Sequence, residues 1–172
     1  MAAASELPID TVREGTTAEQ MANAIFGDGV QVQGASYTGD IDSAGVYSGG
    51  DSIAPGVTPG DTGVILSTGN AESFTNSSGD ANQSASTSAN TTGQNNNAQF
   101  NAAAGAPTRD AAYLEVDIIP DGDVMTMQFV FASEEYPEFA NSQYQDFVGV
   151  WINGAQVDVA VGDGDTDPGN IN

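Results

Sequence analysis

Residues 129–154 constrain the fold of this chain more than any other segment. They read FVFASEEYPEFANSQYQDFVGVWING, which is two apolar, β-prone runs joined by a carboxylate-rich loop. The segment ends in Asn153-Gly154, a dipeptide that is the strongest short-range signal for a β-hairpin. Because Ca²⁺ prefers oxygen ligands, the acidic loop is a candidate calcium site held between two strands.

Short apolar runs bounded by turn residues recur along the chain and predict further strands. A run in the second half of the chain, residues 124–132, is apolar on both faces toward its end, as a central strand is. Five or more short strands favour a mainly β fold, an antiparallel β-sandwich of the jelly-roll kind with long surface loops. The runs that predict these strands are residues 30–33, 63–68, 112–118, 124–132, 147–152 and 157–161.

One short helix is predicted near the N-terminus. Thr17 is placed as its N-cap and Gln20 as the partner in a capping box, and Gly27 as its C-cap. We expect this amphipathic helix to cover one end or side of a sheet. Its apolar face carries Met21, Ala22, Ile25 and Phe26.

The length of 172 residues suits one domain, which we place at residues 16–172 after an N-terminal extension of residues 1–15. Within the domain, residues 75–106 are rich in Ser, Thr, Asn, Gln, Ala and Gly, so they predict a long surface excursion with little buried area. The excursion carries sequons at Asn76, Asn82 and Asn90, a pattern that also arises by chance in such a composition.

Charge and residue usage exclude several kinds of function. Acidic residues number 24 against only Arg13 and Arg109, so the net charge is −22, and nucleic acid and anionic membranes would repel the chain. Without His or Cys there is no thiol nucleophile, no histidine base and no zinc site of the usual type. Self-repulsion calls for cations or a salty medium, and a merely solvated acidic surface is the alternative explanation.

Nothing in the sequence predicts membrane insertion. The first residues, MAAASELPIDTVREG, lack the basic start and apolar stretch of a signal peptide. No run reaches the roughly 18 apolar residues that a spanning helix needs. Export would therefore depend on a signal outside these residues.

The FVFASEEYPEF stretch, followed by Tyr144, Asp146 and a strand that ends in Asn-Gly, resembles the choice-of-anchor L domain of bacterial secreted and surface proteins. Four upstream segments resemble the same domain in the same order: TAEQMANAIFGDGV, Tyr37-Thr38-Gly39, GVILSTG and AAYLEVDIIPDGD. The resemblance spans about residues 16–172 and implies extracellular display more than any reaction. It also implies further strands, supplied by a longer chain or by another copy through strand addition.

The C-terminal loop is the first candidate metal site. Asp163, Asp165 and Asp167 stand at i, i+2 and i+4, a spacing that directs alternate carboxylates inward when a loop curls around Ca²⁺. Pro168 occupies the position of the invariant glycine of an EF-hand, so that motif is not supported. A looser aspartate-rich calcium loop and a solvated turn both remain open.

The second candidate metal site combines Glu134 or Glu135 with Asp146 around a structural Ca²⁺. Adjacent glutamates point to opposite faces of a regular strand, so sharing one ion requires a turn or bulge before Pro137. The alternative is a solvated loop whose acidic groups only limit pairing at a sheet edge.

These features together predict a non-catalytic extracellular or cell-surface module, stabilised by calcium, for adhesion or an extracellular matrix. One alternative is a self-assembling filament subunit completed by strand exchange between copies. A second alternative is a glycan-active hydrolase that uses paired carboxylates. The expected partners are calcium and either other copies of the chain or surface glycans.

Overall fold

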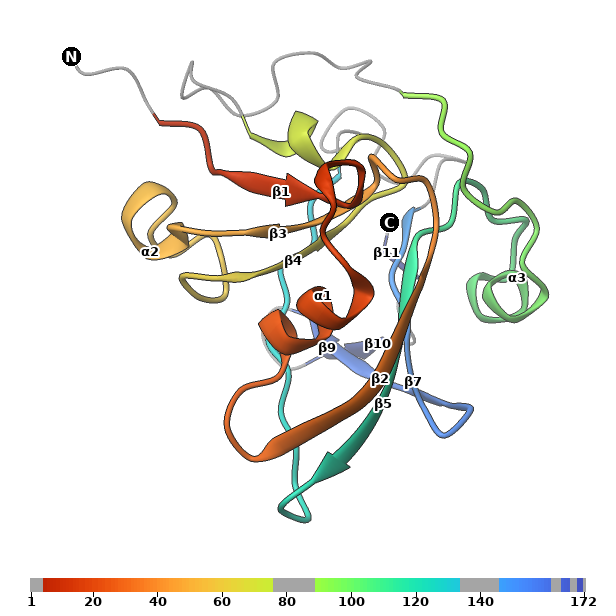
Figure 1. Ribbon diagram of the computed structural model, residues 1–172. Helices are drawn as coiled ribbons and strands as arrows, with labels where there is room; N and C mark the ends of the chain where they lie inside the picture. Colours follow the sequence, from red (N-terminus) through yellow and green to blue (C-terminus); the bar gives the residue numbers. More distant parts are fainter. Residues whose placement is uncertain (1–4, 76–88, 134–145, 162–164, 168–169, 172) are drawn as a thin grey trace. The chain divides into compact units, whose positions relative to one another are not determined.

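The computed structural model describes residues 5–75, 89–133, 146–161, 165–167 and 170–171 (Figure 1). This part of the chain divides into two compact units. The first unit contains residues 5–75, 89–94 and 110–130. The second contains residues 95–109 and 131–133 and the described residues from 146 onward.

The first unit holds two antiparallel sheets (Figure 1). In the three-stranded sheet, β3 (Ala44–Tyr47) lies between β1 (Ile9–Thr11) and β4 (Gly63–Leu66). The other sheet is a long ribbon of β2 (Val30–Thr38) and β5 (Tyr113–Pro120). Exposure largely alternates along β2, so one face of this ribbon is covered and the other is wet, as the sequence pattern predicts.

Helix α1 (Ala18–Ile25) contacts strands of both sheets. Its N-terminus confirms the predicted capping box, with Gln20 N donating to Thr17 Oγ1 at 3.2 Å and Thr17 N donating to Gln20 Oε1 at 2.8 Å. Met21 and Ala22 are fully buried, so the apolar face covers the sheets as expected.

The predicted C-cap of α1 is wrong. Phe26, with φ −96° and ψ 125°, caps the helix while its N–H still donates to the carbonyl of Ala22. Because this residue turns the chain into an extended path, no left-handed residue is needed, and Gly27 does not supply one.

A small apolar cluster packs the three-stranded sheet against α2 and the residues before β1. Leu7, Ile9 and Tyr47 are buried together, and Ile53 from α2 (Gly50–Ile53) and Ile65 pack against them. Two 3₁₀ helices, Val12–Glu14 and Ala71–Phe74, complete the regular structure described in this unit.

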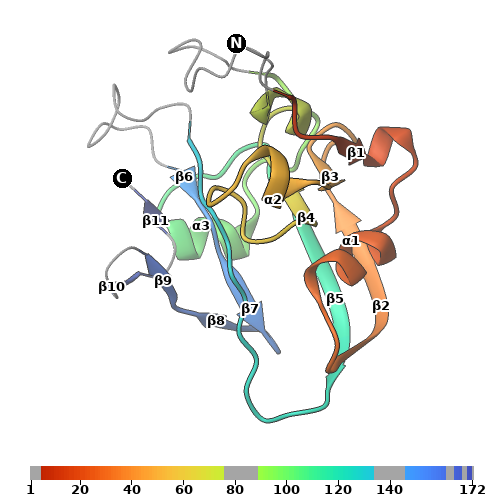
Figure 2. The same cartoon turned by 90° about the vertical axis from the view of Figure 1, so that its left-hand side faces the viewer.

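The second unit contains α3 and three two-stranded antiparallel ribbons (Figure 2). The ribbons pair β7 with β8, β9 with β10, and β6 with β11. The bounds of these elements are Ala98–Ala104 for α3, Asp146–Phe147 for β6, Val150–Ile152 for β7, Ala155–Val157 for β8, Val159–Val161 for β9, Asp165–Asp167 for β10 and Asn170–Ile171 for β11.

The hairpin predicted from Asn153-Gly154 is confirmed between β7 and β8. Asn153 has φ 51° and Gly154 has φ 79°, and two positive φ values define the type I′ turn whose twist matches that of the flanking strands. The turn fixes the register, so Trp151 lies opposite Gln156.

Other expectations need correction. The mainly β, antiparallel character is confirmed, but the sheets are small and not closed, so a jelly-roll sandwich is not confirmed. Residues 124–132 form no strand, because no described strand pairs with them. The polar excursion at residues 75–106 contains the unpredicted helix α3, which Asn97 caps by accepting from the N–H groups of Gln99 and Phe100.

Substitution of Gly45 tests the packing of the three-stranded sheet. A Cβ on Gly45 would lie 2.7 Å from the carbonyl oxygen of Asp10 and 2.9 Å from Cγ2 of Ile9. We therefore expect Gly45→Ala to lower the free energy of unfolding by about 1–3 kcal/mol in urea denaturation. Gly34→Ala is the control, since its Cβ meets nothing closer than 3.8 Å, and a similar loss there would contradict the packing argument.

Candidate functional site

A densely hydrogen-bonded polar cluster forms at the turn from Asp40 to Ser43, between β2 and β3. Asp42 N donates to Asp40 Oδ1 at 2.9 Å, and Ser43 N donates to the carbonyl oxygen of Asp40 at 3.0 Å. The hydroxyl of Tyr37 donates to the same carbonyl at 2.7 Å. It reaches across Gly39, where a Cβ would lie 2.7 Å from Cζ of Tyr37, so the Tyr-Thr-Gly motif is explained by this contact.

Asp40 also anchors a distant part of the chain. Its Oδ2 accepts hydrogen bonds from both the N–H and the Oγ1 of Thr92, each at 2.7 Å. The bonds from Asp42 and Thr92 favour the ionised carboxylate and hold the pKa of Asp40 below its usual value. Burial, with the charge of Asp40 as a smaller contribution, raises the pKa of Tyr37 to about 12, so its hydroxyl remains a donor at neutral pH.

Arg13 forms a bidentate ion pair with the carboxylate of Asp42, through Nε and Nη2. This pair raises the pKa of Arg13 and lowers that of Asp42. The N–H of Arg13 also donates to the carbonyl of Ile41 at 3.0 Å. Since the two side chains are 58% and 30% exposed, solvent screens the charges, and the pair acts chiefly to fix geometry.

The family segment GVILSTG lies against the same turn. Ser67 N donates to the carbonyl of Ser43 at 2.8 Å, and Ser43 Oγ donates to the carbonyl of Gly69 at 2.7 Å. Ala71 N donates to the carbonyl of Asp42 at 2.8 Å. Protein donors thus occupy all four carboxylate oxygens of Asp40 and Asp42, so this cluster is structural rather than a metal centre.

The sequence-predicted metal ligands fall into two sets. Glu134, Glu135 and Asp163 lie outside the described residues. The other three lie in the second unit, Asp146 in β6 and Asp165 and Asp167 in β10. Ser133 Oγ donates to Oδ2 of Asp146.

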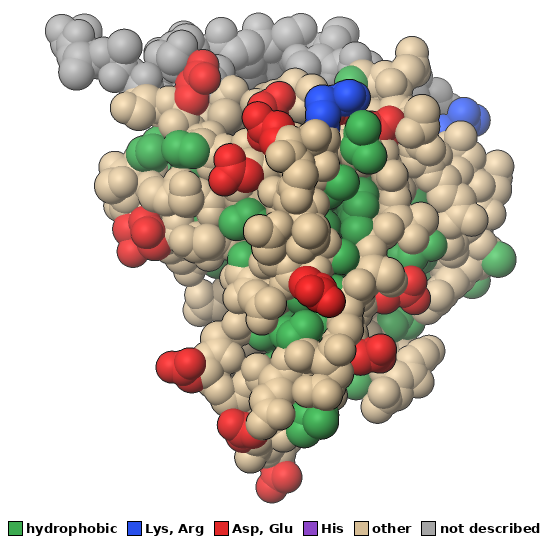
Figure 3. Space-filling model, viewed as in Figure 1, with side chains coloured by type: hydrophobic (Ala, Val, Ile, Leu, Met, Phe, Trp, Pro, Cys, Tyr) green, Lys and Arg blue, Asp and Glu red, His purple; other side chains and the backbone are tan. Residues whose placement is uncertain are grey.

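The ribbon pairings relate these acids along the backbone. β11 pairs with β6 so that Ile171, which follows Asp167 closely in the sequence, lies opposite Asp146. Within the described ranges, no group of three or more acidic side chains is gathered as a metal site. Figure 3 shows acidic side chains dispersed over the face in view rather than collected in one place.

An exposed apolar segment follows β5 in the first unit. Val124 is 85% exposed, Met127 48% and Val130 53%, and Met125 is also exposed. The apolar pattern of the sequence predicts a central strand here, but the structure leaves these side chains exposed. Four such residues in seven positions form a contiguous apolar stretch on an otherwise acidic chain.

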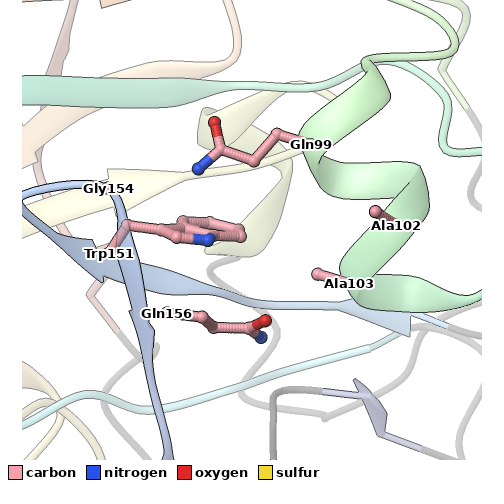
Figure 4. A pocket seen from close by; sticks show the side chains of 6 residues that line it. All are labelled: Gln99, Ala102, Ala103, Trp151, Gly154 and Gln156. Atoms are coloured by element: carbon pink, nitrogen blue, oxygen red, sulfur yellow. The ribbon is translucent and has the colours of Figure 1, made fainter.

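A hollow in the second unit lies between α3 and the β7–β8 hairpin. Its volume is 530 Å³, and its lining carries no charged side chain. Figure 4 shows the indole of Trp151 between the side chains of Gln99 and Gln156, with Ala102 and Ala103 beside them on α3. Sequence reasoning missed this hollow because it did not predict α3. The available signals were Asn97, a common residue at the start of a helix, and Gly105, a common residue just after its end.

The model of the choice-of-anchor L domain family matches residues 9–172. The chain belongs to this family. No curated protein and no solved structure matches the chain.

Membership of the choice-of-anchor L family indicates a bacterial surface-associated or secreted module, and such modules are typically non-enzymatic. In the described ranges, no helix has both the length and the apolar character needed to cross a bilayer. Two of the upstream segments that resemble the family, Tyr37 to Gly39 and GVILSTG, lie at the Asp40 turn, whereas most of the FVFASEEYPEF stretch lies outside the described residues.

The pH dependence of stability tests the Asp40 turn. A carboxylate whose folded pKa is lowered stabilises the fold above its unfolded pKa of about 3.9, and this contribution is lost as pH falls through the folded value. In Asp40→Asn, an amide nitrogen takes the place of one carboxylate oxygen, so the hydrogen bonds that this oxygen accepts from Asp42 or from Thr92 are lost. We expect a lower melting temperature than wild type at pH 5–7, with the gap shrinking below about pH 4.

The control for this experiment is Asp123→Asn, at an exposed turn after β5. Thermal melts followed by circular dichroism across the pH range give the comparison. A gap between Asp40→Asn and wild type that stays constant down to pH 2 would show that the carboxylate charge is not what the turn uses.

Proposed function

We propose that the protein is a self-assembling, calcium-stabilised module of an extracellular matrix or surface layer, in which the apolar segment 124–130 of one copy pairs with an open sheet edge of another. The observation that carries this proposal is the exposure of Val124, Met125, Met127 and Val130 on a segment with no described strand partner. An apolar segment that pairs with none of the described strands can serve as a template for strand addition.

The first unit offers an edge for this pairing. β5 pairs only with β2 among the described strands, so its second edge has no ladder partner. Ile119, near the end of β5, is 51% exposed and adds an apolar side chain at this strand, although the acidic turn at residues 121–123 separates it from the segment. Burying a side chain the size of valine is worth about 1.5–3 kcal/mol, so several such residues supply a useful association energy.

Charge makes this assembly conditional on cations. Each copy carries a net charge of −22, so two copies repel each other at low ionic strength. Screening falls off over about 8–10 Å at physiological salt, and bound divalent cations neutralise charge directly. Calcium outside the cell would therefore favour both folding and association.

The second unit supports a calcium site in this proposal. Asp146 lies opposite Ile171, close along the backbone to Asp165 and Asp167, and carboxylate oxygens suit this hard cation. Glu134, Glu135 and Asp163 flank the same elements in sequence and are proposed as further ligands. Extracellular calcium modules bind with dissociation constants of about 10⁻⁴–10⁻³ M, which suits a switch operated by export.

A glycan hydrolase gains no support from the Trp151 hollow. The lining residues include no carboxylate, whereas hydrolysis needs two of them around the scissile bond. Adhesion to a foreign ligand remains compatible with a matrix role, because a displayed module can do both.

Val130→Asp tests the assembly segment. We expect it to weaken self-association in millimolar calcium by about tenfold or more, since it removes an apolar contact and buries a charge. Sedimentation velocity over a concentration series gives the association constant. Val57→Asp is the matched control, because Val57 is 51% exposed against 53% for Val130 and the charge change is identical.

Equal weakening by both variants would attribute the effect to net charge and remove the segment from the proposal. Monomers at every concentration, with calcium as well as with chelator, would overturn self-assembly altogether.

Asp146→Asn tests the calcium site. At 10 mM calcium and the dissociation constants above, binding stabilises the fold by about 1.4–2.7 kcal/mol, which raises the melting temperature by roughly 3–10 °C. We expect the variant to lose most of this rise, while the amide oxygen still accepts from Ser133. Scanning calorimetry with calcium and with chelator measures it.

Asp117→Asn, an exposed acid on β5 in the other unit, is the matched charge control for Asp146→Asn. A wild-type melting temperature that calcium leaves unchanged would refute the calcium part of the proposal without touching the assembly part.

A further inference from the structure

The three-stranded sheet of the first unit also has an edge without a ladder partner, at β4. Among the described strands, β4 pairs only with β3. Ser67 N donates to the carbonyl of Ser43 at 2.8 Å, which makes these two residues a hydrogen-bonded pair at the end of this antiparallel ladder. Because hydrogen-bonded pairs alternate with pairs that are not, the N–H and C=O groups of Val64 and Leu66 point away from β3.

The edge of β1, on the other side of the same sheet, is obstructed. Thr11 N already donates to Glu14 Oε2 at 3.0 Å, and the carbonyl of Thr11 accepts from Thr16 N at 3.1 Å. Asp10 adds an exposed carboxylate to the same short strand. An added strand would therefore find a charge and few available backbone groups at β1.

The two strands of the β2–β5 ribbon are obstructed in other ways. β5 carries exposed acids at Glu115 and Asp117, and Pro120 has no N–H to donate. On β2, the register shifts between Val32 and Gly34, and such a bulge bends and twists a strand. Charges, prolines and bulges are the devices by which proteins keep sheet edges from pairing. Among the four strands that bound the described sheets of this unit, β4 alone has none of these obstructions.

The charge around β4 suits the apolar segment. Residues 62–71 carry no charged side chain, and residues 124–130 carry none either. On a chain with a net charge of −22, two uncharged stretches can pair without placing acids directly opposite each other, an arrangement that destabilises a sheet. Leu66 is 44% exposed, so the edge also offers apolar area to an added strand.

We propose that β4 is the edge that receives residues 124–130 of a second copy, as a fourth strand of the three-stranded sheet. This inference rests on the proposed self-assembly and names its receiving surface. The outward backbone groups of Val64 and Leu66 hydrogen-bond to the added strand, and main-chain bonds of this kind supply the affinity in strand addition.

Leu66→Asp and Ile119→Asp distinguish the edge of β4 from that of β5. Leu66 is 44% exposed and Ile119 is 51% exposed, and each variant replaces an apolar side chain with one negative charge. In sedimentation velocity of the full chain in millimolar calcium, we expect Leu66→Asp to weaken self-association about tenfold or more and Ile119→Asp less than about threefold.

Leu66→Pro and Leu66→Ala examine the main-chain bonds. Both variants lose the leucine side chain, but only Leu66→Pro loses the outward N–H, which the ladder with β3 does not use. We expect Leu66→Pro to associate about 3- to 10-fold more weakly than Leu66→Ala, as for one lost hydrogen bond. Circular dichroism confirms that each variant is folded.

Three outcomes would overturn β4 as the receiving edge and leave self-assembly intact. They are equal weakening by Leu66→Asp and Ile119→Asp, stronger weakening by Ile119→Asp, and association of Leu66→Pro as tight as that of Leu66→Ala. If Val130→Asp weakens association no more than Val57→Asp, the segment itself is excluded, and both proposals fail together.

Discussion

The hydrogen bonds that converge on the Asp40–Ser43 turn are the constraint on which the first unit depends. Backbone groups of this turn receive Tyr37 from β2, Ser67 and Ala71 from beyond β4, and Arg13 from the N-terminal segment. The side chain of Asp40 also attaches residues 89–94 to the turn, because its Oδ2 accepts two hydrogen bonds from Thr92. Because most partners here are backbone groups, the arrangement tolerates many exposed side-chain changes but few changes to the turn itself. This explains why Tyr37-Thr38-Gly39 and GVILSTG, two of the segments that resemble the family, are rich in glycine and small polar residues.

Charge is the opposing constraint. Arg13 forms an ion pair with Asp42, but the chain has only two arginines and no lysine to set against its 24 acidic residues. In the proposed assembly, this net charge would keep copies apart at low ionic strength and would protect the apolar stretch at residues 124–130 from indiscriminate pairing, as edge charges limit aggregation in other β proteins. Cations relax the same repulsion. In the proposed assembly, the net negative charge would therefore hold copies apart where cations are scarce and allow them to associate where cations are plentiful.

Local signals in the sequence predicted much of the fold. The capping box at Thr17 and the Asn153-Gly154 turn each depend on neighbouring residues, and both are confirmed. The failures are of two kinds. Helix α3 was hidden because its polar surroundings suggested a featureless loop, and the strand at 124–132 was predicted from its own pattern although a strand also needs a partner.

The Asp40 cluster could not have been predicted from spacing at all. Arg13 and Asp42 are 29 residues apart, and Asp40 and Thr92 are 52 apart, so only the folded backbone brings them together. The Trp151 hollow is similar, because it joins a hairpin that the sequence predicted to a helix that it did not. The sequence of such a chain offers many acidic residues as candidate metal ligands. Because they are so numerous, the sequence alone does not distinguish the ligands from acids that are only solvated.

The two compact units divide the proposed roles between different residues. The apolar segment at residues 124–130 belongs to the first unit, and the candidate calcium ligands Asp146, Asp165 and Asp167 belong to the second. In the proposed assembly, calcium would therefore act on association through the net charge of each copy and not by occupying the pairing surface. A substitution at a calcium ligand would then leave the apolar segment intact, and a substitution in the segment would leave the calcium ligands intact.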